Sequence, residues 1–153
     1  MISLFIIIKA QILLWFATKQ ADKAYRGEYK IGRYRDGSPQ FMRPNVRYYI
    51  MPDENDKLIC MNRQEFHKLR TKRQMSQGVL VKHLKKECFY YTPHANGRNP
   101  ISEREKKERI DMYVDYCLQL RKKRKEKKKR DREYVRQVKK ALYASKNAPM
   151  RHY

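Results

Sequence analysis

The chain reads ISEREKKERIDMYVDYCLQLRKKRKEKKKRDREYVRQVKKALYAS over residues 101–145, and this stretch contains neither Gly nor Pro. It opens with capping-box spacing, since Glu105 stands three residues after Ser102. Apolar residues then recur with helical spacing in two stripes, at Ile110, Tyr113, Val114, Cys117 and Leu118 and again at Tyr134, Val135, Val138, Ala141 and Leu142. The pattern predicts one helix from Ser102 to about Ser145, roughly 65 Å long, whose first stripe packs on the rest of the protein.

Between the two stripes lies RKKRKEKKKRDRE (residues 121–133), in which ten of thirteen residues are Lys or Arg. Arg, Lys and Glu favour helix, and Glu126 precedes Arg130 at the spacing that suits an ion pair. The run is therefore predicted to continue the helix and, being cationic on most sides, to contact phosphate groups. The predicted phosphate-binding residues are Arg121, Lys122, Lys123, Arg124, Lys125, Lys127, Lys128, Lys129, Arg130 and Arg132.

The whole chain is strongly basic. Its 153 residues carry a formal net charge of +22, which is far more than solubility requires and which destabilises a compact protein through self-repulsion. A polyanionic partner relieves this repulsion, and nucleic acid fits better than an anionic membrane surface. The alternative interpretation is a basic surface that has no dedicated ligand.

The middle of the chain predicts a small α+β body. Strand-like composition occurs at residues 29–31, 46–51, 58–61 and 88–92, and the turn-forming cluster at residues 52–56 predicts a hairpin. Asn62 and Glu65 then form a second helix start. The expected organisation is a hydrophobic segment at residues 1–20, a strand-and-helix body at 25–99 and a long basic helix at 100–148.

The body also holds basic residues that are weaker nucleic-acid-binding candidates. They are Arg33, Arg35, Arg43, Arg47, Lys68, Arg70, Lys72 and Arg73. Two short helices around residues 75–78 allow a helix-turn-helix interpretation of residues 62–87, in which the second helix would present Gln77, Lys82, Lys85 and Lys86 to DNA. Two ordinary helices packed on a small sheet explain the same pattern.

The first twenty residues, MISLFIIIKAQILLWFATKQ, form the most apolar block. Lys9 and Gln11 interrupt it, and it makes a poor signal peptide because no basic residue precedes the apolar run. Three interpretations stay open: a helix packed in the core or on a partner, a membrane anchor formed by residues 1–17, or a non-native extension. An anchor would leave the basic body in the cytoplasm.

No motif in the sequence predicts a reaction. Cys60, Cys88 and Cys117 lie far apart without a CxxC pair, the four His residues have no metal-ligand spacing, and no phosphate-binding Gly loop occurs. Buried free thiols in a reducing compartment are expected, and the carboxylates of residues 53–56 fit a solvated turn better than a metal site. We therefore expect no enzyme activity, no metal and no cofactor.

These observations predict a non-enzymatic protein that binds RNA or DNA through phosphate contacts. It would act in the cytoplasm or within a nucleoprotein particle, as a component of a ribosome-associated or viral (phage) assembly with other proteins. One alternative is an adaptor attached to a membrane by its N-terminus. A second alternative is a small helix-turn-helix-like DNA-binding regulator.

Overall fold

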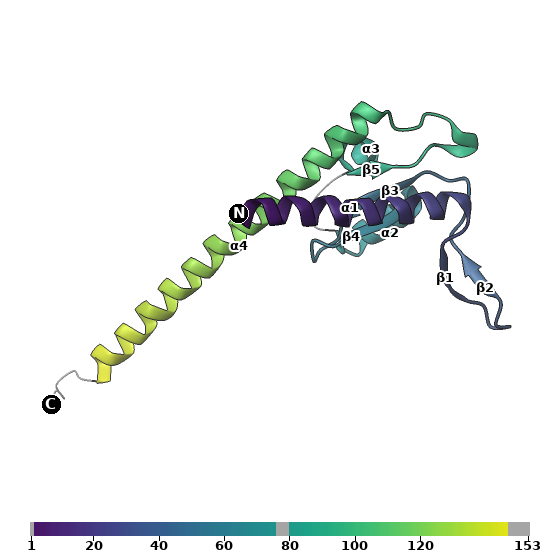
Figure 1. Cartoon of the computed structure of the whole chain (residues 1–153). Helices are drawn as coiled ribbons and strands as arrows, with labels where there is room; N and C mark the ends of the chain where they lie inside the picture. Colours follow the sequence, from purple (N-terminus) through teal and green to yellow (C-terminus); the bar gives the residue numbers. More distant parts are fainter. Residues whose placement is uncertain (1, 76–79, 147–153) are drawn as a thin grey trace.

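The computed structural model describes residues 2–75 and 80–146 and shows the predicted α+β fold (Figure 1). Along the chain the elements are α1 (Ile2–Arg26), β1 (Lys30–Arg33), β2 (Pro39–Phe41), β3 (Tyr48–Pro52), β4 (Leu58–Asn62), α2 (Arg63–Thr71), η1 (Val81–His83), α3 (Leu84–Glu87), β5 (Tyr90–Tyr91), η2 (Ala95–Gly97) and α4 (Glu103–Lys146). The predicted domain boundary at residue 20 falls inside α1, and the predicted helix end at residue 148 lies outside the described residues.

A three-stranded antiparallel sheet with the order β4-β3-β5 forms the centre of the body. β3 and β4 form the predicted hairpin, with Tyr48 opposite Asn62 and Pro52 opposite Leu58. The Asp53 carboxylate orders the turn between them, because it accepts hydrogen bonds from the backbone NH groups of Asn55 (2.8 Å) and Lys57 (2.9 Å). A separate two-stranded hairpin, β1–β2, projects from the body beyond the C-terminal end of α1 (Figure 1).

Side chains alternate along the sheet so that both of its faces are covered. Tyr48 and Ile50 of β3, with Tyr90 of β5, pack in one cluster with α1 and the first part of α4. Met51 and Tyr91 pack in a second cluster with side chains of β4, α2 and α3, namely Met61, Phe66, Leu84 and Cys88. The small sheet thus separates two cores.

α1 belongs to the first of these cores. Ala21 and Ala24 are fully buried, and Leu14 is 2% exposed. Small side chains on this face let the helix lie close to β3, β4 and α4. α1 and α4 run antiparallel, since Lys9 lies near Arg124 and Asp22 lies near Lys106. Of the three interpretations of the N-terminal segment, the packing agrees with a helix of the core.

Both predicted helix starts are confirmed. The Asn62 side chain accepts a hydrogen bond from the backbone NH of Glu65 (2.8 Å), and its amide donates back to the Glu65 carboxylate (3.3 Å). The Ser102 hydroxyl accepts from the backbone NH of Glu105 (3.1 Å) at the start of α4. Each cap satisfies a backbone donor that the first helical turn leaves free, so the caps fix where α2 and α4 begin.

The burial of α1 generates a stability test. Leu14→Ala removes a side chain that is 2% exposed, so we expect it to lower the free energy of unfolding by about 2–5 kcal/mol. Ile12→Ala is the matched control, because Ile12 is 50% exposed on the same helix; its effect should stay within about 0.5 kcal/mol. Urea unfolding measures both. Equal, small effects would contradict the placement of α1 in the core.

Candidate nucleic-acid interface

All ten predicted phosphate-binding residues lie on α4, in the part that extends away from the body (Figure 1). We call residues 121–146 the basic arm. Arg121 is half-buried at its base, and every side chain from Lys122 to Lys146 is exposed. The predicted continuation of the helix through the basic run is confirmed, and the arm presents about 38 Å of helix to solvent.

The first part of α4 fixes the arm to the body through Arg109. The Arg109 guanidinium is buried, donates hydrogen bonds to the backbone carbonyls of Cys88 (2.6 Å) and Lys86, and lies 3.3 Å from the Glu105 carboxylate. The Tyr91 hydroxyl donates to the same carboxylate (2.5 Å). This hydrogen bond, aided by the Arg109 charge, lowers the pKa of Glu105, so the carboxylate stays ionised beside Arg109.

The positive charges of the basic run have no carboxylate partners within the described chain. The ion pairs found among residues 2–75 and 80–146 are Arg26–Glu28, Arg104–Glu108 and Arg109–Glu105. The predicted pair between Glu126 and Arg130 is not formed, so that expectation is wrong. Helical spacing permits such a pair, but two fully solvated side chains gain little from holding one geometry.

A groove between α1 and α4 brings the basic run next to the N-terminal segment. Its volume is about 440 Å³, and it lies where the N-terminal half of α1 passes the base of the arm. Apolar side chains of both helices line it, namely Phe5, Ile6, Leu13 and Leu120. Its cations are Lys9 from α1 and Arg121, Arg124, Lys125 and Lys128 from α4. These two segments lie far apart in the sequence, and only the antiparallel packing of α1 and α4 brings them together at one groove.

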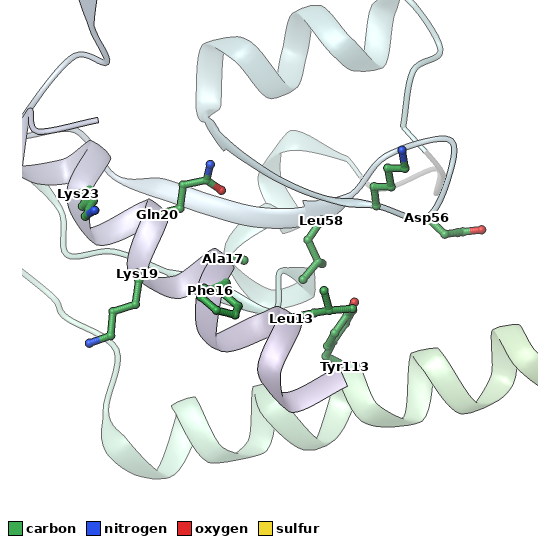
Figure 2. Close-up of a pocket in the computed structure, with 10 residues that line it drawn as sticks. Leu13, Phe16, Ala17, Lys19, Gln20, Lys23, Asp56, Leu58 and Tyr113 are labelled. Atoms are coloured by element: carbon green, nitrogen blue, oxygen red, sulfur yellow. The ribbon is translucent and has the colours of Figure 1, made fainter. Parts of the chain in front are cut away.

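A second hollow of about 560 Å³ continues along α1 and shares Leu13, Asp56 and Tyr113 with the groove. Figure 2 shows Leu13 and Phe16 of α1 beside Leu58 of β4 and Tyr113 of α4, with Lys19 pointing away from them. Its one carboxylate, Asp56, accepts a hydrogen bond from the Tyr116 hydroxyl. The two hollows are therefore continuous along one apolar side of α1, and Lys and Arg side chains border them.

The weaker nucleic-acid-binding candidates are spread over the body. Arg33 and Arg35 lie on the β1–β2 hairpin, Arg43 follows β2, and Lys68, Arg70, Lys72 and Arg73 lie on or just after α2; all seven are exposed. The hairpin lies at the end of α1 opposite to the arm (Figure 1). The structure thus does not gather the hairpin candidates and the basic run into one surface.

Arg47 differs from the other candidates because it is 8% exposed. Its guanidinium donates a hydrogen bond to the backbone carbonyl of Asn99 (2.6 Å) and lies 4.9 Å from the centre of the Tyr91 ring. These contacts tie the loop before α4 to the sheet. The Arg47 charge therefore supports the fold and is shielded from a large polyanion.

The predicted pair of short helices is found in part. α2 spans Arg63–Thr71, and the second helix consists of the turn η1 followed by the four-residue α3. Residues 76–79, which include Gln77 and the expected turn, lie outside the described residues. Lys82, Lys85 and Lys86 are exposed, and Lys85 lies over the Tyr91 ring.

The three cysteines are free thiols, as expected, but the expected burial is found for Cys88 alone, since Cys60 and Cys117 are partly exposed. Burial raises the pKa of Cys60 and of Cys88 to about 12. Burial also raises the pKa of Cys117, while the nearby charges of Arg124 and Lys9 act in the opposite direction. Among the described residues, no group of three or more His, Cys, Asp or Glu side chains lies close enough to hold a metal ion.

Comparison with known proteins gave no match to this chain, whether with protein-family models, curated proteins or solved structures. Function is therefore inferred from the charge, exposure and arrangement of the chain's own residues.

The raised thiol pKa values predict slow alkylation of the folded protein. At about pH 8.5, Cys60 and Cys88 should react with iodoacetamide at least about 100-fold more slowly than in the urea-unfolded chain, because only the thiolate reacts and both groups stay protonated. Mass spectrometry of each Cys-containing peptide over time measures the rates. Alkylation of Cys88 at the unfolded rate would contradict a buried, protonated thiol.

Proposed function

We propose that this protein is a non-enzymatic nucleic-acid-binding protein whose basic arm contacts phosphate backbones. One observation carries the proposal: ten Lys and Arg residues lie on an exposed helix that extends from the body, and none of them is paired with a carboxylate in the described chain. Such a surface leaves its charge repulsion unrelieved until a polyanion binds.

The arrangement of the charges indicates how the arm would bind. Cations cover most of the circumference of the arm, interrupted by Glu126, Asp131 and Glu133. Lys and Arg neutralise phosphates and release counterions, and they read no base sequence in doing so. An arm with charge on several sides fits best where phosphates surround it, as inside a folded RNA or a packed nucleoprotein. A ribosome-associated or viral assembly is therefore the proposed setting, in the cytoplasm or within the particle.

The far end of the arm suits a protein neighbour in the same assembly. Its second apolar stripe is present on the helix, but Tyr134, Val135, Val138 and Leu142 are exposed. An apolar stripe of this kind beyond a basic run is typical of a helix that packs on a partner. We propose that the basic run holds nucleic acid and the tip contacts protein.

The helix-turn-helix alternative has less support. A recognition helix presents several side chains along a groove of the duplex, whereas α3 has one turn, Leu84–Glu87. The exposed Lys82, Lys85 and Lys86 suit phosphate contact as well as base contact. Sequence preference among DNA duplexes would support this alternative.

A salt series tests the arm. The change of Lys127, Lys128, Lys129 and Arg130 to Gln should weaken binding to mixed RNA and DNA oligonucleotides. It should also lower the slope of log K against log salt by about 3, since each phosphate contact contributes about 0.7–0.9. Fluorescence anisotropy across the salt series measures both quantities.

The control removes four charges from exposed positions outside the arm, with Lys23, Lys30, Lys57 and Lys107 changed to Gln. This variant has the same net charge as the arm variant but should change the slope by less than about 1. Equal effects of the two variants would show that net charge, rather than the arm, drives binding. Weak binding of the unmodified protein with a flat salt response would overturn the proposal.

A further inference from the structure

The N-terminal half of α1 exposes an unusually apolar surface. Seven large apolar side chains on this one helix are between 44% and 67% exposed: Leu4, Phe5, Ile8, Ile12, Leu13, Trp15 and Phe16. We call them the α1 apolar face. Soluble monomers rarely expose a contiguous apolar patch of this kind unless it meets a partner or a membrane.

α1 has the length and composition of a membrane-spanning helix over Ser3–Arg26, yet its packing opposes spanning. Its other side is fixed in the core through Leu14, Ala21 and Ala24, and the Tyr90 hydroxyl donates a hydrogen bond to Asp22 (2.6 Å). To span a bilayer, the helix would have to leave the core of the protein. To lie on a bilayer, it needs only the face that is already exposed.

Positive charge borders the α1 apolar face. On the groove side stand Lys9 and the α4 cations Arg121, Arg124, Lys125 and Lys128. Toward the middle of α1, the Lys19 ammonium lies 5.5 Å from the centre of the Trp15 ring. Residues 1–20 contain no acidic side chain, and the nearby Asp22 and Asp56 accept hydrogen bonds from tyrosines. An apolar strip beside cations and a Trp matches a bilayer interface with anionic headgroups.

The same charges argue against a second copy of this chain as the occupant. Each copy carries a net charge of +22, and contact between two such faces would bring two sets of groove cations together. We propose that the α1 apolar face docks on an anionic phospholipid bilayer, with α1 lying in the interface and the groove cations on lipid phosphates. This inference goes beyond the proposed function and does not depend on it.

The chain contains a single Trp, and it lies on this face with 55% of its surface exposed. Trp15 fluorescence in the unmodified full-length protein therefore reports docking directly. Vesicles of phosphatidylcholine with about one third phosphatidylglycerol should shift the emission to shorter wavelength and protect Trp15 from acrylamide, because the ring leaves water. Vesicles of phosphatidylcholine alone should give a much smaller shift.

Two pairs of variants separate apolar docking from charge attraction. Ile8→Gln/Ile12→Gln should reduce partitioning to anionic vesicles by at least about tenfold, whereas Ile31→Gln/Phe41→Gln, at exposed positions on the β1–β2 hairpin, should leave it unchanged. Arg124→Gln/Lys128→Gln should weaken it about tenfold. Lys123→Gln/Arg130→Gln removes the same residue types from the opposite side of α4 and should have a smaller effect. Vesicle co-sedimentation measures all four.

Three results would overturn the docking proposal. Sedimentation with anionic vesicles without a Trp15 shift would show that the cations alone bind lipid. A shift that depends on protein concentration and needs no vesicles would identify a second copy as the occupant. A shift produced by RNA and not by vesicles would assign the face to nucleic acid. Failure of the nucleic-acid proposal is a separate result, since Ile8→Gln/Ile12→Gln leaves the basic run intact.

Discussion

The packing of α1 between the sheet and α4 is the contact on which the rest of the structure depends. Ala21 and Ala24 let the helix backbone lie against β3 and β4, and Leu14 fills the core between the helices. Without α1, the face of the sheet that carries Tyr48 and Ile50 would lose its main helical cover, and exposing these side chains to water would destabilise the fold. The same packing gives the first part of α4 a surface to rest on.

In each of the two long helices, one part packs in the core and the other part is exposed to solvent. In α1 the buried part is concentrated toward the C-terminus, and in α4 it lies in the N-terminal part. Because the helices run antiparallel, their free halves meet at the same end of the molecule (Figure 1). The apolar and the cationic surfaces therefore adjoin each other, although more than one hundred residues separate them in the sequence. The β1–β2 hairpin lies at the other end of α1.

Local signals in the sequence predicted the local structure well. The caps at Asn62 and Ser102, the β3–β4 hairpin and the long helix follow from side-chain chemistry within a few residues. The sequence left the role of α1 open, because apolar residues surround its N-terminal half and hide the buried stripe. The burial of Arg47 and the groove formed by Lys9 and Arg124 depend on contacts between distant segments, which periodicity does not report. The missing Glu126–Arg130 pair shows that correct spacing is not sufficient where both side chains are solvated.

The contacts of Arg109 that fix α4 to the body have a mechanical consequence. The helix continues for about 55 Å from Arg109 to Lys146, and all of its last 25 residues are exposed to solvent. α4 therefore acts as a rigid rod that pivots near the buried guanidinium of Arg109. A rotation of about 5° at this pivot would move the far end by roughly 5 Å. Any partner that contacts both the body and the far end of α4 therefore has to match the angle between α4 and the body. That angle is set at Arg109, about 55 Å from the far end of the helix.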